Sequence, residues 1–180
     1  MIEVRAIEDK DLEKIMNWRM RPDITKWMNT DPQLTMESQR KWLEKINSDN
    51  DSKHWMIVID GVDSGVINIT DIDGKSAFWG YYIGEKDKRS IQNAVSLELS
   101  LYKYCFEVLK LECVKSEVFA ANKGVVQLHK KCGNVVDEIR VAEVNKNGVE
   151  YDVVILHIEK NKFEEISQNT SYEYINFVTE

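Results

Sequence analysis

The chain contains little cysteine, proline or glycine: 3 Cys, 2 Pro and 8 Gly in 180 residues. Cys105, Cys113 and Cys132 are odd in number and show no Cys-x-x-Cys spacing, so neither a disulfide framework nor a zinc site is indicated. No stretch approaches the roughly 20 apolar residues that a membrane helix requires, and the first residues lack the basic and then apolar order of a secretory signal. These absences predict small buried thiols, no metal and no membrane partner, in a reducing cytoplasm.

Positive charge is also scarce. Lys and Arg number 24 against 31 Asp and Glu, which gives a net charge of −7. A general nucleic-acid binder is excluded, because neutralising phosphates requires a basic surface. Disorder is excluded by the 43% of hydrophobic residues, among them 5 Trp, 7 Tyr and 5 Phe. The length suits one domain with a real hydrophobic core.

Apolar periodicity predicts the element order β-α-α-β-β-β-α-β-α-β-β. The expected strands are 2–7, 55–59, 62–72, 76–83, 113–119, 135–144 and 149–158, and the expected helices include 95–109 and 123–132. Asp60-Gly61, Asp73-Gly74 and Asn147-Gly148 are hairpin signals, Thr35 and Asn122 are predicted helix caps, and Pro22 marks a restart. This order predicts one α/β (α+β) domain over residues 1–160. Residues 161–180 show no clean period and are treated as a tail of unknown role, which docks on a partner or on the body of the domain.

The segment from Ile83 to the helix 95–109 has the layout of a phosphate-binding frame. A strand is followed by a polar loop and a long amphipathic helix, whose N-terminus presents unpaired N–H groups and partial positive charge. Lys86, Lys88 and Arg89 add positive charge to the loop. The alternative is an ordinary solvated turn.

His129 lies on the apolar face of the 123–132 helix. Val125, Leu128, His129 and Cys132 follow the i, i+3, i+4, i+7 spacing, so the imidazole faces inward. Such a histidine is either a core residue or, where it lines a cleft, a proton donor near neutral pH.

The strand–loop–helix from Trp79 to Leu109, with the following strand and helix to Gly133, resembles the GNAT superfamily of acyl-CoA N-acyltransferases. That fold is a mixed, mostly antiparallel twisted sheet flanked by helices. The superfamily's phosphate loop reads R/Q-x-x-G-x-G/A; Arg89 and Ala94 match it, whereas Gln92 replaces the central glycine and Ser90 another common one. Blocks such as Asn17-Trp18-Arg19 and Trp79-Gly80-Tyr81 are similar to the sugar-nucleotide branch that includes the pseudaminic-acid pathway enzymes, which act on UDP-4-amino-4,6-dideoxy-N-acetyl-β-L-altrosamine.

The resemblance implies an enzyme that transfers acetyl directly from acetyl-CoA to the 4-amino group of a UDP-amino-sugar. The cofactor-binding residues it implies are Tyr82, Ile83, Arg89, Ser90, Gln92, Asn93, Ala94, Asn122 and His129. The substrate-binding residues it implies are Arg19, Trp27, Met28, Thr70 and Tyr82. His129 is the implied proton donor. Glu117 is a candidate base acting through a water; the alternative is an exposed or paired carboxylate.

Two rival functions stay open at this point. One is a protein N-terminal acetyltransferase of the ribosomal-protein alanine type. The other is a degenerate acyl-CoA-binding domain without turnover, because glycine lets the backbone approach phosphates and adopt positive φ, whereas Gln92 brings a Cβ. The expected partner is a small molecule, and a homodimer is left open.

Overall fold

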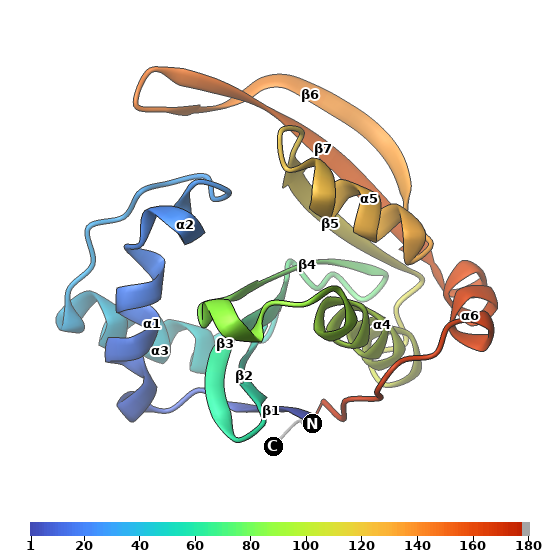
Figure 1. Ribbon diagram of the computed structural model, residues 1–180, viewed down its shortest axis with the longest axis horizontal. Helices are drawn as coiled ribbons and strands as arrows, with labels where there is room; N and C mark the ends of the chain where they lie inside the picture. Colours follow the sequence, from blue (N-terminus) through green and yellow to red (C-terminus); the bar gives the residue numbers. More distant parts are fainter. Residues whose placement is uncertain (178–180) are drawn as a thin grey trace.

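The computed structural model describes residues 1–177, which fold around a seven-stranded sheet (Figure 1). The strand order is β1-β2-β3-β4-β5-β7-β6, and every pair is antiparallel except β4 with β5. The elements are β1 (Ile2–Ala6), η1 (Asp9–Asp11), α1 (Leu12–Arg19), α2 (Pro22–Thr25), α3 (Met36–Ser48), β2 (Lys53–Ile59), β3 (Val62–Thr70), β4 (Ser76–Ile83), η2 (Lys86–Lys88), α4 (Ile91–Glu107), β5 (Cys113–Phe119), α5 (Lys123–Lys131), β6 (Val135–Lys146), β7 (Val149–Glu159) and α6 (Lys160–Asn169). The predicted mixed, mostly antiparallel sheet flanked by helices is confirmed.

The helix boundaries follow local chemistry. Pro22 takes the first position of α2, where its missing N–H removes no helical hydrogen bond. The Thr35 hydroxyl accepts from the Ser38 amide at 3.1 Å and caps α3, as predicted. Asn122 occupies the N-cap position of α5, as predicted, but its side chain makes no capping hydrogen bond.

All three predicted hairpins form, and two of them close in a two-residue turn. Asp60-Gly61 and Asn147-Gly148 all have positive φ, between 52° and 80°, as a two-residue hairpin turn of this kind requires. The Asp73-Gly74 connection is a wider loop, since β3 ends at Thr70 and β4 begins at Ser76. The Asp73 carboxylate accepts the Ser76 amide there at 2.7 Å, which replaces the expected tight turn.

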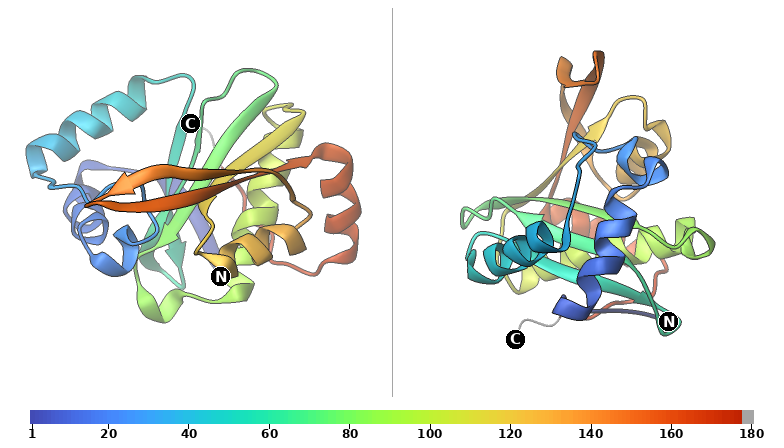
Figure 2. Two further views of the ribbon diagram at one scale, coloured as in Figure 1. Left: turned by 90° about the horizontal axis from the view of Figure 1, so that it is seen from above. Right: turned by 90° about the vertical axis from the view of Figure 1, so that its left-hand side faces the viewer.

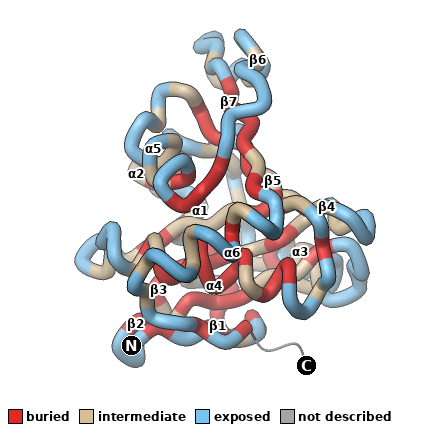
Figure 3. Tube along the Cα trace, turned by 90° about the vertical axis from the view of Figure 1, so that its right-hand side faces the viewer, coloured by how far each residue is buried: buried red, intermediate tan, exposed pale blue. Residues whose placement is uncertain are grey.

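The two faces of the sheet carry separate cores. Helix α4 packs on one face, with Ile67, Leu97 and Phe106 almost fully buried, while Leu12 of α1 and Met56 of β2 lie in the core of the other face. Figure 1 shows α1 and α3 on one side of the strands and α4 on the other, and Figure 3 shows the buried centre. Burying each such side chain contributes about 1.5–3 kcal/mol.

The C-terminal segment docks on the body of the domain, one of the two alternatives left open by the sequence. Phe163 of α6 packs against Phe106, with 5.6 Å between the ring centroids. Phe177 lies 5.0 Å from the ring of Trp55, and Ile175 is 1% exposed. Residues 161–177 therefore complete the core, and residues 178–180 of the predicted tail lie outside the described part of the chain.

The β6–β7 hairpin projects beyond the rest of the sheet (Figure 2), and its tip contacts the turn after α2. β6 is exposed along most of its length, whereas β7 buries its central residues (Figure 3). Of the predicted buried thiols, Cys105 and Cys132 are buried and Cys113 is half-buried. Within residues 1–177, no helix combines the length and the apolar character needed to cross a bilayer.

Candidate active site

The parallel pair in the sheet opens into a cavity. β4 and β5 pair from Ser76 to Phe78 and from Cys113 to Lys115, and no further pairing between them is described. A cavity of about 380 Å³ lies where they diverge. Of the predicted site residues, the cavity brings together Trp27, Met28, Tyr82, Ile83, Arg89, Ser90, Ala94, Glu117, Asn122 and His129. Gln92, Asn93, Arg19 and Thr70 do not line it.

A second hollow, of about 260 Å³, lies on the other face of the same strands. Thr70 and Phe78, which pair across β3 and β4, line it. Both residues alternate with side chains of the α4-side core, so they point to the opposite face. Trp79, Gly80 and Glu117 line both hollows. The divergence of β4 and β5 thus offers approaches from two faces that meet at these three residues.

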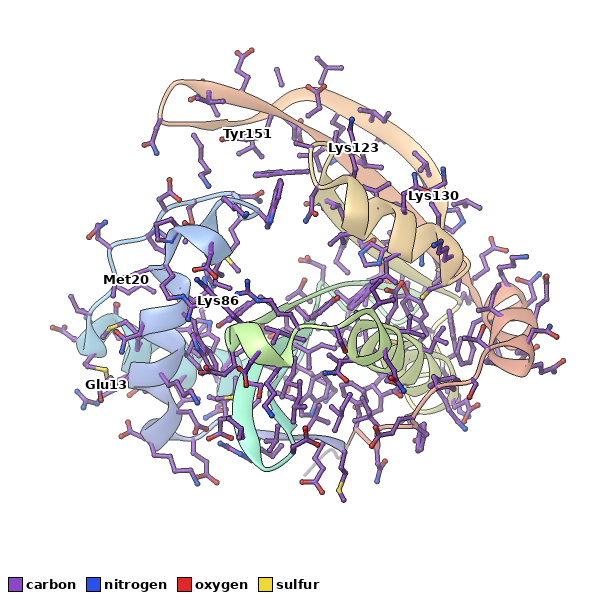
Figure 4. All side chains as sticks on the ribbon, in the orientation of Figure 1. Glu13, Met20, Lys86, Lys123, Lys130 and Tyr151 are labelled. Carbon is purple, nitrogen blue, oxygen red and sulfur yellow. The ribbon has the colours of Figure 1, made fainter. Side chains whose placement is uncertain are left out.

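Helix α4 presents its N-terminus at one end of the larger cavity. The Ser90 hydroxyl caps the helix by accepting the Asn93 amide at 3.0 Å, and the Asn93 side chain donates to the Lys88 carbonyl at 2.8 Å. The first amides of a helix have no intrahelical acceptor and attract anions. Figure 4 shows Lys86 on η2 and Lys123 on α5, and neither is among the residues that line the cavity.

The position where Gln92 replaces the family's glycine has an ordinary helical backbone. Gln92 lies in the first turn of α4, is exposed, and is not among the described residues with positive φ. A side chain is accepted there without strain, because the position needs only helical geometry. The structure therefore removes the need for positive φ at Gln92, which was one of the two grounds for expecting weaker phosphate binding.

Arg89 is held by an ion-pair chain that the sequence did not reveal. Its guanidinium donates to the Asp23 carboxylate at 2.8 Å and to the Ile83 carbonyl at 2.8 Å. Arg21 donates to the same carboxylate and to the Gly84 carbonyl. Hydrogen bonds from Arg21 and then Arg89 hold the pKa of Asp23 well below its usual range. Asp23 thus links the turn after α1 to the loop before α4.

His129 faces the cavity with one nitrogen already engaged. It is 4% exposed, and its Nδ1 lies 2.9 Å from a carboxylate oxygen of Glu98, which is fully buried in α4. Its ring lies 5.2 Å from that of Trp79. Among residues 1–177 no hydrogen bond to Nε2 is present, so this nitrogen is available to the cavity.

The Glu117 carboxylate is exposed and forms a long ion pair. Its carboxylate is 43% exposed and lies 3.8 Å from Arg140 of β6. Arg140 makes a shorter contact, 2.7 Å, with Glu138. These contacts agree with the alternative that Glu117 is an exposed, ion-paired carboxylate. Its role as a base stays a prediction.

Trp27 and Met28, two of the predicted substrate-binding residues, lie in the turn after α2. Trp27 is 41% exposed, with the Lys26 ammonium 5.1 Å from its ring centroid. Arg19, at the end of α1, has a buried Nε without a partner among the described residues. Burial raises the pKa of the neighbouring Tyr82, and the positive charge of Arg19 opposes that rise.

Lys146 at the tip of the β6–β7 hairpin fixes this turn. Its ammonium donates to the carbonyls of Thr25 at 2.6 Å and Met28 at 2.9 Å, and lies 3.2 Å from Asp31. Lys146, followed by Thr25, lowers the pKa of Asp31. The hairpin thereby supports the chain segment that carries Trp27.

Two buried polar atoms in the cavity wall have no partner among the described residues. They are Nε1 of Trp79 and Oγ of Ser116, which are 6% and 2% exposed overall. Buried polar groups are ordinarily hydrogen-bonded, so these two are suited to a bound ligand. Sequence reasoning missed both, together with Asp23 and Glu98.

A family model described as the acetyltransferase (GNAT) domain matches residues 2–135. The chain belongs to the GNAT acetyltransferase family. Two curated relatives, both named acetyltransferase PseH, come from Campylobacter jejuni subsp. jejuni strains 81-176 and NCTC 11168. They are 28% and 26% identical over 125 residues, which is 69% of this chain and 77% of theirs.

Solved structures agree on the fold. A spermidine N-acetyltransferase from Vibrio cholerae in complex with CoA and spermine is similar with a TM-score of 0.84, at 23% identity over 91% of this chain and 98% of that one. A probable acetyltransferase is similar with a TM-score of 0.80, at 19% identity over 89% and 94% of the two chains.

The GNAT acetyltransferase is therefore an enzyme that takes its acetyl group from acetyl-CoA, as the resemblance implied. The cavity suits this co-substrate. The capped N-terminus of α4, with basic residues before it, favours a diphosphate. Beyond Phe78, the backbone of β4 faces the gap without a β5 partner, so an extended arm can hydrogen-bond to it.

Proposed function

We propose that this acetyltransferase acetylates the 4-amino group of a UDP-amino-sugar, as in biosynthesis of the pseudaminic-acid type. The relatives named PseH support this acceptor class. The main structural support is the arrangement of charged side chains around the cavity, because it favours an anionic acceptor over a polyamine. A cytoplasmic location and a homodimer stay predictions.

The carboxylates of the cavity are unsuited to a polycation. Among the described lining residues they are Asp23 and Glu117, and each lies next to an arginine side chain. A polyamine would have to displace these arginines to gain an ion pair. Lys26, beside the exposed ring of Trp27, offers instead a cation for a phosphate and an aromatic face for a nucleobase.

The donor side would hold acetyl-CoA in a fixed position. The diphosphate would lie at the start of α4, where Arg89 retains guanidinium donors that neither Asp23 nor Ile83 uses. A β4 amide near Tyr82 would bind the thioester carbonyl oxygen, an interaction of about 3–4 kcal/mol when preorganised. Alignment with the acceptor amine contributes about 7–11 kcal/mol.

The reaction then needs one net proton transfer. The neutral amine attacks the acetyl carbon, its nitrogen loses a proton through water, and the carbon–sulfur bond breaks. The departing CoA thiolate takes a proton from Nε2 of His129. Glu117, where the two hollows meet, is placed to accept the amine proton through a water.

The test is an acceptor panel in which the CoA thiol is titrated as it is released. We expect kcat/KM for a UDP-4-amino-4,6-dideoxy-N-acetyl-hexosamine to exceed that for spermidine and for an alanine-headed peptide by about 10²-fold or more, since a site with matched polar groups discriminates strongly. A preference for spermidine rejects the acceptor class. A preference for the peptide supports the N-terminal acetyltransferase, and binding of CoA without any turnover supports the degenerate domain.

Arg19→Ala is expected to raise the KM for the nucleotide-sugar by about 10–10²-fold, because hydrogen bonds to a charged group contribute about 1.5–3 kcal/mol. The KM for acetyl-CoA should stay within about two-fold of its original value. Steady-state kinetics with each substrate varied in turn measures both. Arg40→Ala is the control, since Arg40 is a 57% exposed arginine of α3 paired with Asp9. A raised KM for acetyl-CoA alone would move Arg19 to the donor side.

A further inference from the structure

A buried polar network lies behind His129. The carboxylate of Glu98 is fully buried and contacts His129 Nδ1 at 2.9 Å. It accepts from the hydroxyl of Tyr102 at 2.7 Å and from the Asn134 amide at 3.3 Å. The Asn134 amide also donates to the Tyr102 hydroxyl at 2.8 Å and to the His129 carbonyl at 3.0 Å. The network joins α4 to the end of α5.

This network is costly for stability alone. A carboxylate removed from water loses much of its solvation free energy, and well-packed apolar residues of similar volume are often neutral or stabilising in its place. No lysine or arginine pairs with Glu98 among residues 1–177. The imidazole of His129 is the partner that can become cationic, and it lines the cavity.

We propose that Glu98 is a positioning residue for His129, which rests on the acid role proposed for that histidine. An ionised carboxylate only accepts hydrogen bonds, so Nδ1 carries the proton and Nε2 is turned to the cavity. The negative charge also stabilises the imidazolium. Tyr102 and Asn134 donate further hydrogen bonds to the carboxylate.

The proton that His129 gives to the CoA thiolate can be followed through the His129–Glu98 pair. Before transfer, the ring carries protons on Nδ1 and Nε2 and forms an ion pair with Glu98. When the carbon–sulfur bond breaks, the thiolate takes the Nε2 proton. The ring is then neutral with its proton on Nδ1, and that proton still meets the Glu98 carboxylate. The carboxylate changes neither its protonation nor its position.

The other groups that face this pair stay neutral over the working range of pH. They are Tyr81 of β4, Tyr102 of α4 and Cys132 after α5, and burial, reinforced by Glu98, raises the pKa of each. Lys130 and Lys131 are exposed on α5. A change in the pH profile on altering Glu98 can therefore be attributed to the Glu98–His129 pair.

The decisive variant is Glu98→Gln, which keeps the shape of the side chain and removes its charge. We expect kcat to fall about 10–10²-fold, with the KM for acetyl-CoA within about two-fold, as for loss of a group that orients and charges a functional imidazole. The high-pH limb of the kcat profile should move to lower pH, because the imidazolium loses its counter-charge. In a His129→Phe background, the same change should alter kcat less than about two-fold.

Tyr102→Phe is the matched control, since it removes another hydrogen bond of the same carboxylate and leaves the Glu98–His129 contact. It should change kcat less than about three-fold. An equal loss in Tyr102→Phe, or a further loss from Glu98→Gln in the His129→Phe background, would assign Glu98 a structural role and overturn the proposal.

A second measurement does not depend on folding of any variant. Nitrogen-15 spectra of the histidines in the unaltered protein should show neutral His129 with its proton on Nδ1; a proton on Nε2 would contradict the proposal. The kinetics use whichever amine the unaltered enzyme acetylates. Failure of the sugar-nucleotide acceptor is therefore distinguishable from failure of the role of Glu98.

Discussion

His129→Phe is expected to lower kcat by about 10²–10⁴-fold and to leave the KM for acetyl-CoA within about two-fold. Proton donation to the thiolate is needed only in the transition state, so its loss affects turnover rather than binding. The residual rate reflects alignment of the two substrates, which this substitution does not remove. Phenylalanine preserves a flat ring beside Trp79. Stopped-flow or steady-state release of the CoA thiol measures the change.

The substitution leaves the buried Glu98 without its imidazole partner, so the comparison needs a second variant. His129→Gln offers an amide to Glu98 and cannot donate a proton to the thiolate, and we expect the same loss of kcat from it. Near-UV circular dichroism at low temperature confirms the folded fraction of both. An unchanged kcat removes the acid role, and a raised KM for acetyl-CoA with kcat intact makes His129 a binding residue.

Local signals predicted the frame of the site. Asp60-Gly61 and Asn147-Gly148 predicted two hairpins, and the polar loop after Ile83 predicted where α4 begins beside the cavity. Each depends on a few neighbouring residues whose preferred backbone geometry agrees with the fold. Asp73-Gly74 also lies in a hairpin connection, but its loop is wider than expected because β3 ends at Thr70, two residues before the expected end at Ile72.

Glu98 was missed although its pattern is visible in the sequence. Val95, Glu98, Leu99 and Tyr102 follow the i, i+3, i+4, i+7 spacing of one helix face, so a carboxylate stands within an apolar stripe. A buried charge of that kind predicts a functional partner. The partner itself, His129, follows 31 residues later and could not be identified by spacing.

Other contacts of the site have no local signature. The Lys146 ammonium reaches the Thr25 carbonyl across 121 residues of sequence. Asp23 meets Arg89 across 66 residues. Only the completed sheet brings these groups together. The sequence could therefore name most cavity residues but not the ion pairs that hold them.

Gly65→Ala is expected to lower the free energy of unfolding by about 3 kcal/mol, the upper range for overpacking a tight core. A Cβ at this position would lie 2.1 Å from the Tyr82 carbonyl oxygen and 2.9 Å from the Cα of Ile83. Both are backbone atoms of the paired strand β4, which cannot rotate away. At about 2–4 °C per kcal/mol, the Tm should fall by about 6–12 °C in a thermal melt.

The close approach at Gly65 also fixes where β4 ends and the loop toward α4 begins. A register shift in β3 next to Gly65 leaves the Ser64 carbonyl to accept the amides of Gly84 at 2.7 Å and Glu85 at 3.1 Å, so β4 ends there and the loop toward α4 begins. CoA affinity should therefore fall with stability in Gly65→Ala. Gly80→Ala is the control, because its Cβ would meet only the Asn68 side chain at an ordinary 3.7 Å, and its Tm should stay within about 2 °C. Equal melting temperatures for the two variants would show that β3 and β4 can separate at this end. The contact at Gly65 would then not be what positions the loop toward α4.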